Sequence, residues 1–214
     1  MGGYSPRFDD AVLELGGRRV CLLPTANPDP EGLVRFYESF AHRAEPSHVS
    51  FDPWPRADLR EHVLSRDAIY VAGGNTANAL AIWRAHGFDA ALRDAWERGI
   101  LLCGWSAGMI CWFEAGVTDS FGPQLAGMRD GLGFLPGSAC PHYDGEERRR
   151  PIYRELVANG FPAGYAADDS AALFFEGTAL REVIAIEAGP TAYRVEPGSE
   201  TPLEARILSD ARAT

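Results

Sequence analysis

The stretch from Ile100 to Trp112, ILLCGWSAGMICW, places Ser106 between two glycines at the end of an apolar run. Ile100 to Cys103 predicts a buried strand, and Ala107 to Trp112 can begin a helix. A serine at such a junction can be held as an exposed nucleophile, because the flanking glycines let neighbouring backbone come close. The Ala107 N–H that follows can stabilise an oxyanion. Ser106 is therefore a candidate nucleophile, and the alternative is that it is only a turn residue.

A second glycine-rich turn, YVAGGNTANAL at residues 70 to 80, again joins an apolar strand to a helix. Because Gly73 and Gly74 carry no side chains, a backbone N–H here can point at the carbonyl oxygen that Ala107 faces. Acyl transfer uses two donors of this kind. Asn75 is a candidate substrate-binding residue. The alternative is an ordinary strand-to-helix turn in which Asn75 or the next threonine caps the helix.

A serine near its free pKa is a weak nucleophile and needs a positioned base. His142, in GSACPHYD, is the only histidine after Ser106 and follows it by 36 residues. An α/β-hydrolase also carries its histidine after its serine, but this interval is too short for the later strands of that fold. His142 is thus a candidate base outside the α/β-hydrolase fold, and the alternative is a loop histidine.

Apolar runs alternate with amphipathic stretches along the chain, which predicts a mostly parallel sheet with helices on both faces. Two of the helices are expected to stop at Gly87 and Gly99. From about Ala171 the pattern changes to short strands typical of an antiparallel edge. We expect a single α/β domain over residues 1–214. Strands are expected in segments 18–26, 48–54, 67–74, 99–106, 137–143, 164–175, 181–189 and 191–197, and helices in 29–44, 56–66, 75–87 and 89–99.

Composition excludes several classes of function. The net charge of −10 argues against a nucleic-acid partner. The chain begins without an apolar signal region and has no run of about 18 apolar residues, so we expect a cytoplasmic protein with no membrane partner. Four cysteines match no zinc pattern and are expected as small buried hydrophobes, with no metal. All 20 basic residues are arginine, which excludes a Walker lysine, a Schiff base and a Ser-Lys dyad.

In this order and at these separations, VAGGNTANAL, GWSAG and PHYD resemble the peptidase E (aspartyl dipeptidase) family, which also contains the cyanophycinases. The resemblance covers about Tyr70 to Phe175. It implies a serine peptidase on a class I glutamine-amidotransferase-like (flavodoxin-like) α/β fold, without metal or organic cofactor. It further implies that Ser106 is the nucleophile, His142 the general base, and the amides of Gly74 and Ala107 the oxyanion hole.

The resemblance also implies an acidic residue that orients the imidazole, and several positions compete for this role. YAADDS offers Asp168, with Asp169 beside it, and GVTDSFG offers Asp119. Asp144, two residues after the histidine, would share the side of His142 on an extended strand. We rank Asp168 first, Asp119 second and Asp144 third, and expect one of the first two to line the substrate pocket. The alternative for Asp168 is a polar turn.

Substrate choice is expected to depend on the segment after the histidine, PHYDGEERRRPIYREL. The family uses a basic residue there to hold an aspartyl carboxylate. Arg148, Arg149 or Arg150 can make a bidentate contact of this kind, and we name Arg149 as the candidate. Two neighbouring glutamates oppose such binding. The alternative is that the run is the solvated start of a helix.

The preferred hypothesis is a serine peptidase, similar to dipeptidase E, that hydrolyses short peptides, with Asp-X dipeptides as candidate substrates. A non-peptidase amidase or esterase remains an alternative, because a serine, a histidine and an aspartate specify acyl transfer and not the acyl group. A catalytically inactive small-molecule binding domain is the other alternative. The expected partner is a small peptide, and a homodimer is left open.

Overall fold

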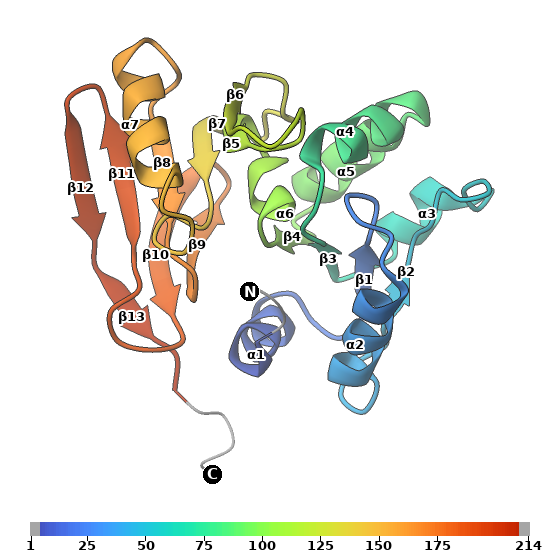
Figure 1. The fold of residues 1–214 in the computed structure, drawn as a ribbon. Helices are drawn as coiled ribbons and strands as arrows, with labels where there is room; N and C mark the ends of the chain where they lie inside the picture. Colours follow the sequence, from blue (N-terminus) through green and yellow to red (C-terminus); the bar gives the residue numbers. More distant parts are fainter. Residues whose placement is uncertain (1–4, 210–214) are drawn as a thin grey trace. The chain divides into compact units, whose positions relative to one another are not determined.

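The computed structural model describes residues 5–209 and divides into two compact units, Gly3–Gly108 and Met109–Thr214 (Figure 1). The first unit contains one β-sheet and the second contains two. The α/β class expected from the sequence is confirmed. That residues 1–214 form a single domain stays a prediction.

The first unit contains a four-stranded, entirely parallel sheet with the strand order β2-β1-β3-β4. Every residue of β1 and β3 is buried. Strands covered on both faces consist of continuous apolar residues, which explains the apolar runs in the sequence. The order 2-1-3-4 is that of doubly wound, flavodoxin-like sheets. The strands are β1 (Val20–Leu23), β2 (Ser47–His48), β3 (Ala68–Val71) and β4 (Leu101–Gly104).

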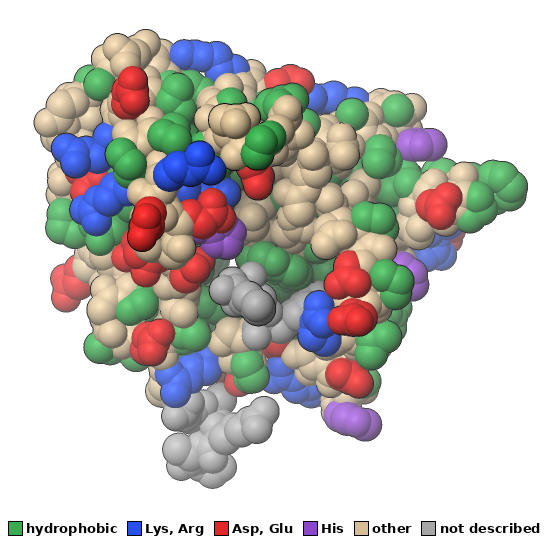
Figure 2. All heavy atoms as spheres, viewed as in Figure 1, with side chains coloured by type: hydrophobic (Ala, Val, Ile, Leu, Met, Phe, Trp, Pro, Cys, Tyr) green, Lys and Arg blue, Asp and Glu red, His purple; other side chains and the backbone are tan. Residues whose placement is uncertain are grey.

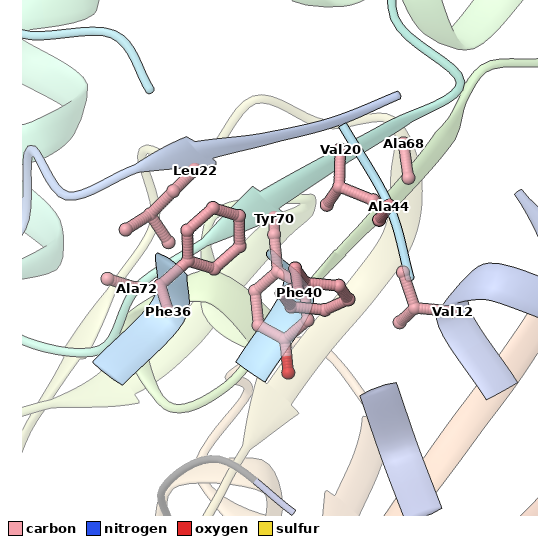
Figure 3. Packing of buried hydrophobic residues seen from close by; sticks show 9 residues of the cluster. All are labelled: Val12, Val20, Leu22, Phe36, Phe40, Ala44, Ala68, Tyr70 and Ala72. Carbon is pink, nitrogen blue, oxygen red and sulfur yellow. The ribbon is translucent and has the colours of Figure 1, made fainter. Parts of the chain in front are cut away.

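Helices cover both faces of this sheet. On one face, Val12 of α1 and Phe36 of α2 pack with Leu22 of β1 in a buried cluster (Figure 3). Cys21 points to the opposite face, where its Sγ lies 3.8 Å from Nε2 of His62 in α3. Helix α5 packs against both α3 and α4. The helices are α1 (Pro6–Leu15), α2 (Pro30–Phe40), α3 (Leu59–Leu64), α4 (Thr76–Ala85) and α5 (Phe88–Glu97), and α6 (Ala107–Ile110) begins in this unit and ends in the second.

Local sequence signals set the ends of these helices. Asp29 caps α2 by accepting hydrogen bonds from two backbone N–H groups, and Pro30 occupies the first helical position. Gly87 and Gly99 follow α4 and α5 with φ angles of 64° and 78°, as the sequence predicts for helix stops.

The second unit contains a six-stranded mixed sheet, β12-β11-β8-β7-β5-β6, and a three-stranded sheet, β13-β10-β9. Strands β5, β7 and β8 are parallel, whereas β11 pairs antiparallel with β8 and β12. The antiparallel C-terminal strands are therefore confirmed. The strands are β5 (Phe113–Thr118), β6 (Ala126–Met128), β7 (Leu135–Cys140), β8 (Gly164–Ala167), β9 (Ala171–Glu176), β10 (Ala179–Ala185), β11 (Ala192–Glu196), β12 (Ser199–Leu203) and β13 (Ala205–Ile207).

One helix, α7 (Arg149–Ala158), packs on the six-stranded sheet of this unit. Its buried Tyr153 and Val157 join Ala166 of β8 and Val195 of β11 in a second core cluster. The arginine run begins a helix, in agreement with the alternative given for it in the sequence analysis. The first turn of this helix is only partly exposed to solvent, because Arg149 is buried.

Several elements depart from the sequence expectations. Helix α1 and strands β5, β6, β12 and β13 were not predicted, and β2 covers two residues where a strand over 48–54 was expected. The cysteines are free; three are buried and Cys103 is partly buried, close to the expectation. No helix within residues 5–209 is long and apolar enough to cross a membrane. Figure 2 shows acidic and basic side chains interspersed on the face in view.

The cluster in Figure 3 predicts which aromatic side chains stabilise the first unit. Phe36 is fully buried, and its ring centroid lies 4.9 Å from that of Phe40. We expect Phe36→Ala to lower the free energy of unfolding by about 3–5 kcal/mol, because it leaves a cavity. Val34→Ala on the same helix is the control, since Val34 is 55% exposed, and its effect should stay within about 0.5 kcal/mol. Equal losses in urea unfolding would contradict this assignment of the core.

Candidate active site

Ser106 lies in the turn between β4 and α6, where the sequence places it. Strand β4 ends at Gly104 and α6 begins at Ala107. The φ angle of Ser106 is 56°, in the left-handed region. A residue with a Cβ adopts this conformation at a cost of roughly 1–2 kcal/mol. Such strain persists only where the surrounding structure enforces it, and it is frequent at functional sites.

The two glycines of GWSAG are required because the backbone of β3 passes close to both. A Cβ on Gly104 would lie 2.4 Å from the Val71 carbonyl oxygen, and a Cβ on Gly108 would lie 2.3 Å from the same atom. Any larger residue at either position would collide with this backbone oxygen. The glycines therefore allow α6 to start directly against β3, which fixes the turn that carries Ser106.

The second glycine-rich turn lies beside the first. A Cβ on Gly73 would lie 3.2 Å from Cβ of Ser106 and 2.8 Å from Nε1 of Trp105. The backbone N–H groups of Gly74 and Ala107 donate to no acceptor within residues 5–209. Two unused amide donors on these turns match the donor requirement of an oxyanion hole.

Asn75 lies at the N-terminus of α4. Its side-chain oxygen accepts a hydrogen bond of 2.9 Å from the Asn78 N–H, so it caps the helix. This is the alternative considered for the turn in the sequence. Substrate binding by Asn75 stays a prediction.

In the second unit, His142 is paired with a carboxylate. Nδ1 of His142 lies 2.7 Å from Oδ1 of Asp169, and the two side chains are 17% and 31% exposed. A carboxylate at Nδ1 holds the imidazole in the tautomer whose Nε2 is free to accept a proton. His142 itself has a φ of 55°, so it also occupies the left-handed region.

The turn after His142 holds Asp169 in place. The N–H of Asp169 donates to Oδ1 of Asp144 over 2.7 Å. Asp144 was expected to share the side of His142 on an extended strand. This expectation is corrected, because the chain turns directly after the histidine and Asp144 binds the backbone of Asp169 instead.

The residues ranked first and second as the imidazole partner lie elsewhere. Asp168 is 7% exposed, and its Oδ2 accepts hydrogen bonds from the Thr191 N–H at 3.0 Å and the Tyr193 hydroxyl at 3.4 Å. Burial raises the pKa of its carboxyl group. Asp119 is exposed in the turn after β5. The structure thus places Asp169 on the imidazole, where the sequence favoured Asp168.

The sequence offers Asp168 and Asp169 as neighbours and carries no signal that separates them. Strand β8 ends at Ala167, and Asp169 lies in the turn that follows. Asp168 contacts Tyr193 of β11, which packs against the core cluster of this unit. Strand β11 therefore engages Asp168, and Asp169 pairs with His142.

The arginines proposed for substrate binding are already engaged. Arg149 is 3% exposed; its Nε donates to Glu146 and one terminal nitrogen donates to the Val117 carbonyl oxygen over 2.9 Å. Arg150 pairs with Glu200, and the exposed Arg148 donates to a carbonyl oxygen. A substrate carboxylate at Arg149 would have to displace Glu146. Among residues 5–209 no group of three or more histidine, cysteine, aspartate or glutamate side chains is arranged to hold a metal ion.

The chain is similar to known peptidases. The model of peptidase family S51 matches residues 3–183. The uncharacterized peptidase YgaJ of Bacillus subtilis (strain 168) is 48% identical over 222 residues, which cover 97% of this chain and 96% of YgaJ. Peptidase E of Shewanella denitrificans is 28% identical over 145 residues, or 64% of this chain and 59% of that protein.

Solved structures share the fold. A candidate peptidase E protein from Listeria monocytogenes EGD-e superposes with a TM-score of 0.66 at 18% identity and covers 87% of this chain and 96% of that chain. A peptidase from an acI-B1 Actinobacterium gives a TM-score of 0.69 at 17% identity, with 96% and 92% covered. At these identities the likeness concerns the α/β fold alone.

The buried guanidinium of Arg149 leads to a stability prediction. Arg149→Ala should lower the free energy of unfolding by about 1–3 kcal/mol, because the buried Val117 carbonyl loses its donor. Arg148→Ala, next to it and exposed, is the control and should change stability by no more than about 0.5 kcal/mol. An Arg149→Ala variant with unchanged urea unfolding but weaker binding of acidic peptides would instead place Arg149 in substrate recognition.

Proposed function

The chain belongs to peptidase family S51 and is a peptidase, and we propose that it hydrolyses short peptides by a serine mechanism with Ser106 as nucleophile. The observation that carries the proposal is the strained turn at Ser106, which Gly104 and Gly108 hold against the backbone of β3. Strain at a lone serine between a strand and a helix is the arrangement of a nucleophile in hydrolases.

His142 is the general base of the proposed mechanism, and Asp169 is the residue that orients it. Because the Nδ1–H of His142 is bonded to the Asp169 carboxylate, Nε2 is left to take the proton from the Ser106 hydroxyl. The same nitrogen then returns the proton to the leaving amine as the acyl-enzyme forms. Asp169 remains ionised and stabilises the imidazolium.

The amides of Gly74 and Ala107 form the proposed oxyanion hole. Both donors are free within the described chain, and both belong to turns that approach Ser106. Donors of this type bind the negative charge that develops on the carbonyl oxygen. Their hydrogen bonds are therefore stronger in the transition state than in the ground state.

The proposed substrates are short peptides without a fixed preference for N-terminal aspartate. Aspartate recognition through the arginine run would fall to the exposed Arg148, because the guanidinium groups of Arg149 and Arg150 bind Glu146 and Glu200. Carboxylate-bound arginines offer a second carboxylate few free donors.

Turnover of a dipeptide and amide library tests this function. Ser106→Ala and His142→Ala should each lower kcat by about 10³-fold or more, and the double variant should be little worse, because the two residues act as one unit. A reaction without protein is the blank. Multiplicative losses would contradict the shared role, and turnover of esters or simple amides without any peptide would favour a non-peptidase hydrolase. Ser106 should also react with a fluorophosphonate probe.

Two neighbouring aspartates provide a matched test of the imidazole partner. Asp169→Asn should lower kcat by orders of magnitude, up to about 10⁴-fold, with little change in KM, because the amide favours the wrong imidazole tautomer. Asp168→Asn keeps an acceptor for the Thr191 N–H and should cost less than about tenfold. Steady-state kinetics of both variants measure these losses. A larger loss of kcat in Asp168→Asn than in Asp169→Asn would assign the imidazole partner to Asp168.

A further inference from the structure

The last hairpin of the second unit lies beyond the part of the chain that matches the family model. That match ends at residue 183, whereas β11 and β12 cover Ala192–Glu196 and Ser199–Leu203. We call residues 191–203 the C-terminal hairpin. Its strand β11 pairs with β8, the strand that leads into Asp168 and Asp169.

The C-terminal hairpin holds the residue directly after His142. Tyr143 is 2% exposed, and its hydroxyl donates a hydrogen bond to the Glu200 carboxylate. Its ring centroid lies 5.3 Å from that of Tyr193 on β11. Tyr143 is thus fixed to both strands of the hairpin, so the backbone that carries the imidazole has little freedom to rotate.

Arg150 completes this contact. It forms an ion pair with Glu200, and its guanidinium carbon lies 5.3 Å and 4.9 Å from the ring centroids of Tyr143 and Tyr193. Burial alone would raise the pKa of Glu200, but hydrogen bonds from Arg150 and Tyr143 outweigh it and hold the pKa below its usual value. Glu200 is therefore a carboxylate at neutral pH, and a charged acceptor strengthens the hydrogen bond from Tyr143.

The same hairpin holds the residue directly before Asp169. The Asp168 N–H donates to the Thr191 carbonyl over 2.9 Å, and the Thr191 N–H donates back to the Asp168 carboxylate over 3.0 Å. Tyr193 adds a hydrogen bond to this carboxylate. Rotation of Asp168 would break these bonds in a buried position, where an unpaired polar group is costly.

We propose that the C-terminal hairpin positions the His142–Asp169 pair, and that Glu200 is a positioning residue which acts on His142 through Tyr143. The hairpin binds Tyr143, which follows His142, and Asp168, which precedes Asp169. The distance between the imidazole and the carboxylate therefore depends on the C-terminal hairpin. The inference rests on the proposed function, since it assigns the pair a role in catalysis. A hairpin that only stabilised the fold would change the unfolding free energy and leave the pair unaltered.

The test compares Glu200→Ala, Glu200→Gln and the control Glu196→Ala, which removes an exposed ion pair with Arg194 on the same hairpin. Glu200→Ala should lower kcat by about ten- to hundredfold with KM nearly unchanged, because a small misplacement of the base slows proton transfer. Glu200→Gln keeps an acceptor for the Tyr143 hydroxyl and should recover most of this loss. Glu196→Ala should match the wild type.

A second readout needs no substrate. The proton shared by His142 Nδ1 and Asp169 should give a downfield NMR resonance in the ligand-free protein, identified by its absence in His142→Gln. Glu200→Ala should shift or broaden this resonance, while Glu196→Ala should leave it unchanged. An unaltered resonance together with wild-type kcat in folded Glu200→Ala would overturn the proposal.

The test still decides if Glu200→Ala does not fold or if the wild type has no peptidase activity. If Glu200→Ala fails to fold, Tyr143→Phe removes only the hydroxyl and should show the same loss of kcat and the same change in the resonance; wild-type values would again overturn the inference. If the wild type hydrolyses no peptide, the proposed function fails, and the resonance in the Glu200 variants still decides whether the hairpin positions the pair.

Discussion

The carbonyl oxygen of Val71 is the constraint on which the serine turn depends. Gly104 and Gly108 both approach it too closely to carry a side chain, and the Trp105 N–H donates to it over 3.3 Å. Val71 pairs in register with Gly104 across β3 and β4, and its neighbour Tyr70 packs in the core of the first unit. Burial of that core offsets the cost of the left-handed Ser106, so packing and the candidate chemistry are connected through a few backbone atoms.

The second unit adds hydrogen bonds to close backbone approach. A Cβ on Gly145 would lie 2.2 Å from Oδ2 of Asp169, so the chain passes close to this carboxylate. His142 and Asp169 are also held by hydrogen bonds among polar groups, through Asp144 on one side and the segment near Thr191 on the other. Such bonds are individually modest but directional, and in buried surroundings they reinforce one another. Steric exclusion therefore defines the serine turn, whereas the histidine and its carboxylate depend on both close approach at Gly145 and a polar network.

The sequence predicts the elements whose determinants are local. Buried parallel strands are continuous apolar runs, and glycines mark the ends of α4 and α5 and the turn at Ser106. Features that depend on residues distant in the chain could not be predicted from the sequence. Arg149 is part of a polar run, yet its guanidinium binds the Val117 carbonyl, 32 residues away. Strand β12 is polar and contains Pro202, which an edge strand tolerates but which reads as a loop. Which of two adjacent aspartates meets His142 depends on the pairing of β8 with its neighbours.

That pairing makes the number of residues in β8 important for the positions of the two aspartates that follow it. Asp168 directly follows β8 and is bonded to Thr191, and Asp169 lies in the next turn and is bonded to His142. Because the pairing of β8 with β11 fixes where the strand ends, inserting or deleting one residue between Gly164 and Asp168 would shift both carboxylates relative to these partners. A side chain at Gly164 is also excluded, because a Cβ there would lie 1.9 Å from the Ser138 carbonyl oxygen. Relatives of this chain should therefore keep both the glycine that begins this strand and its number of residues, with insertions confined to the loops at its two ends.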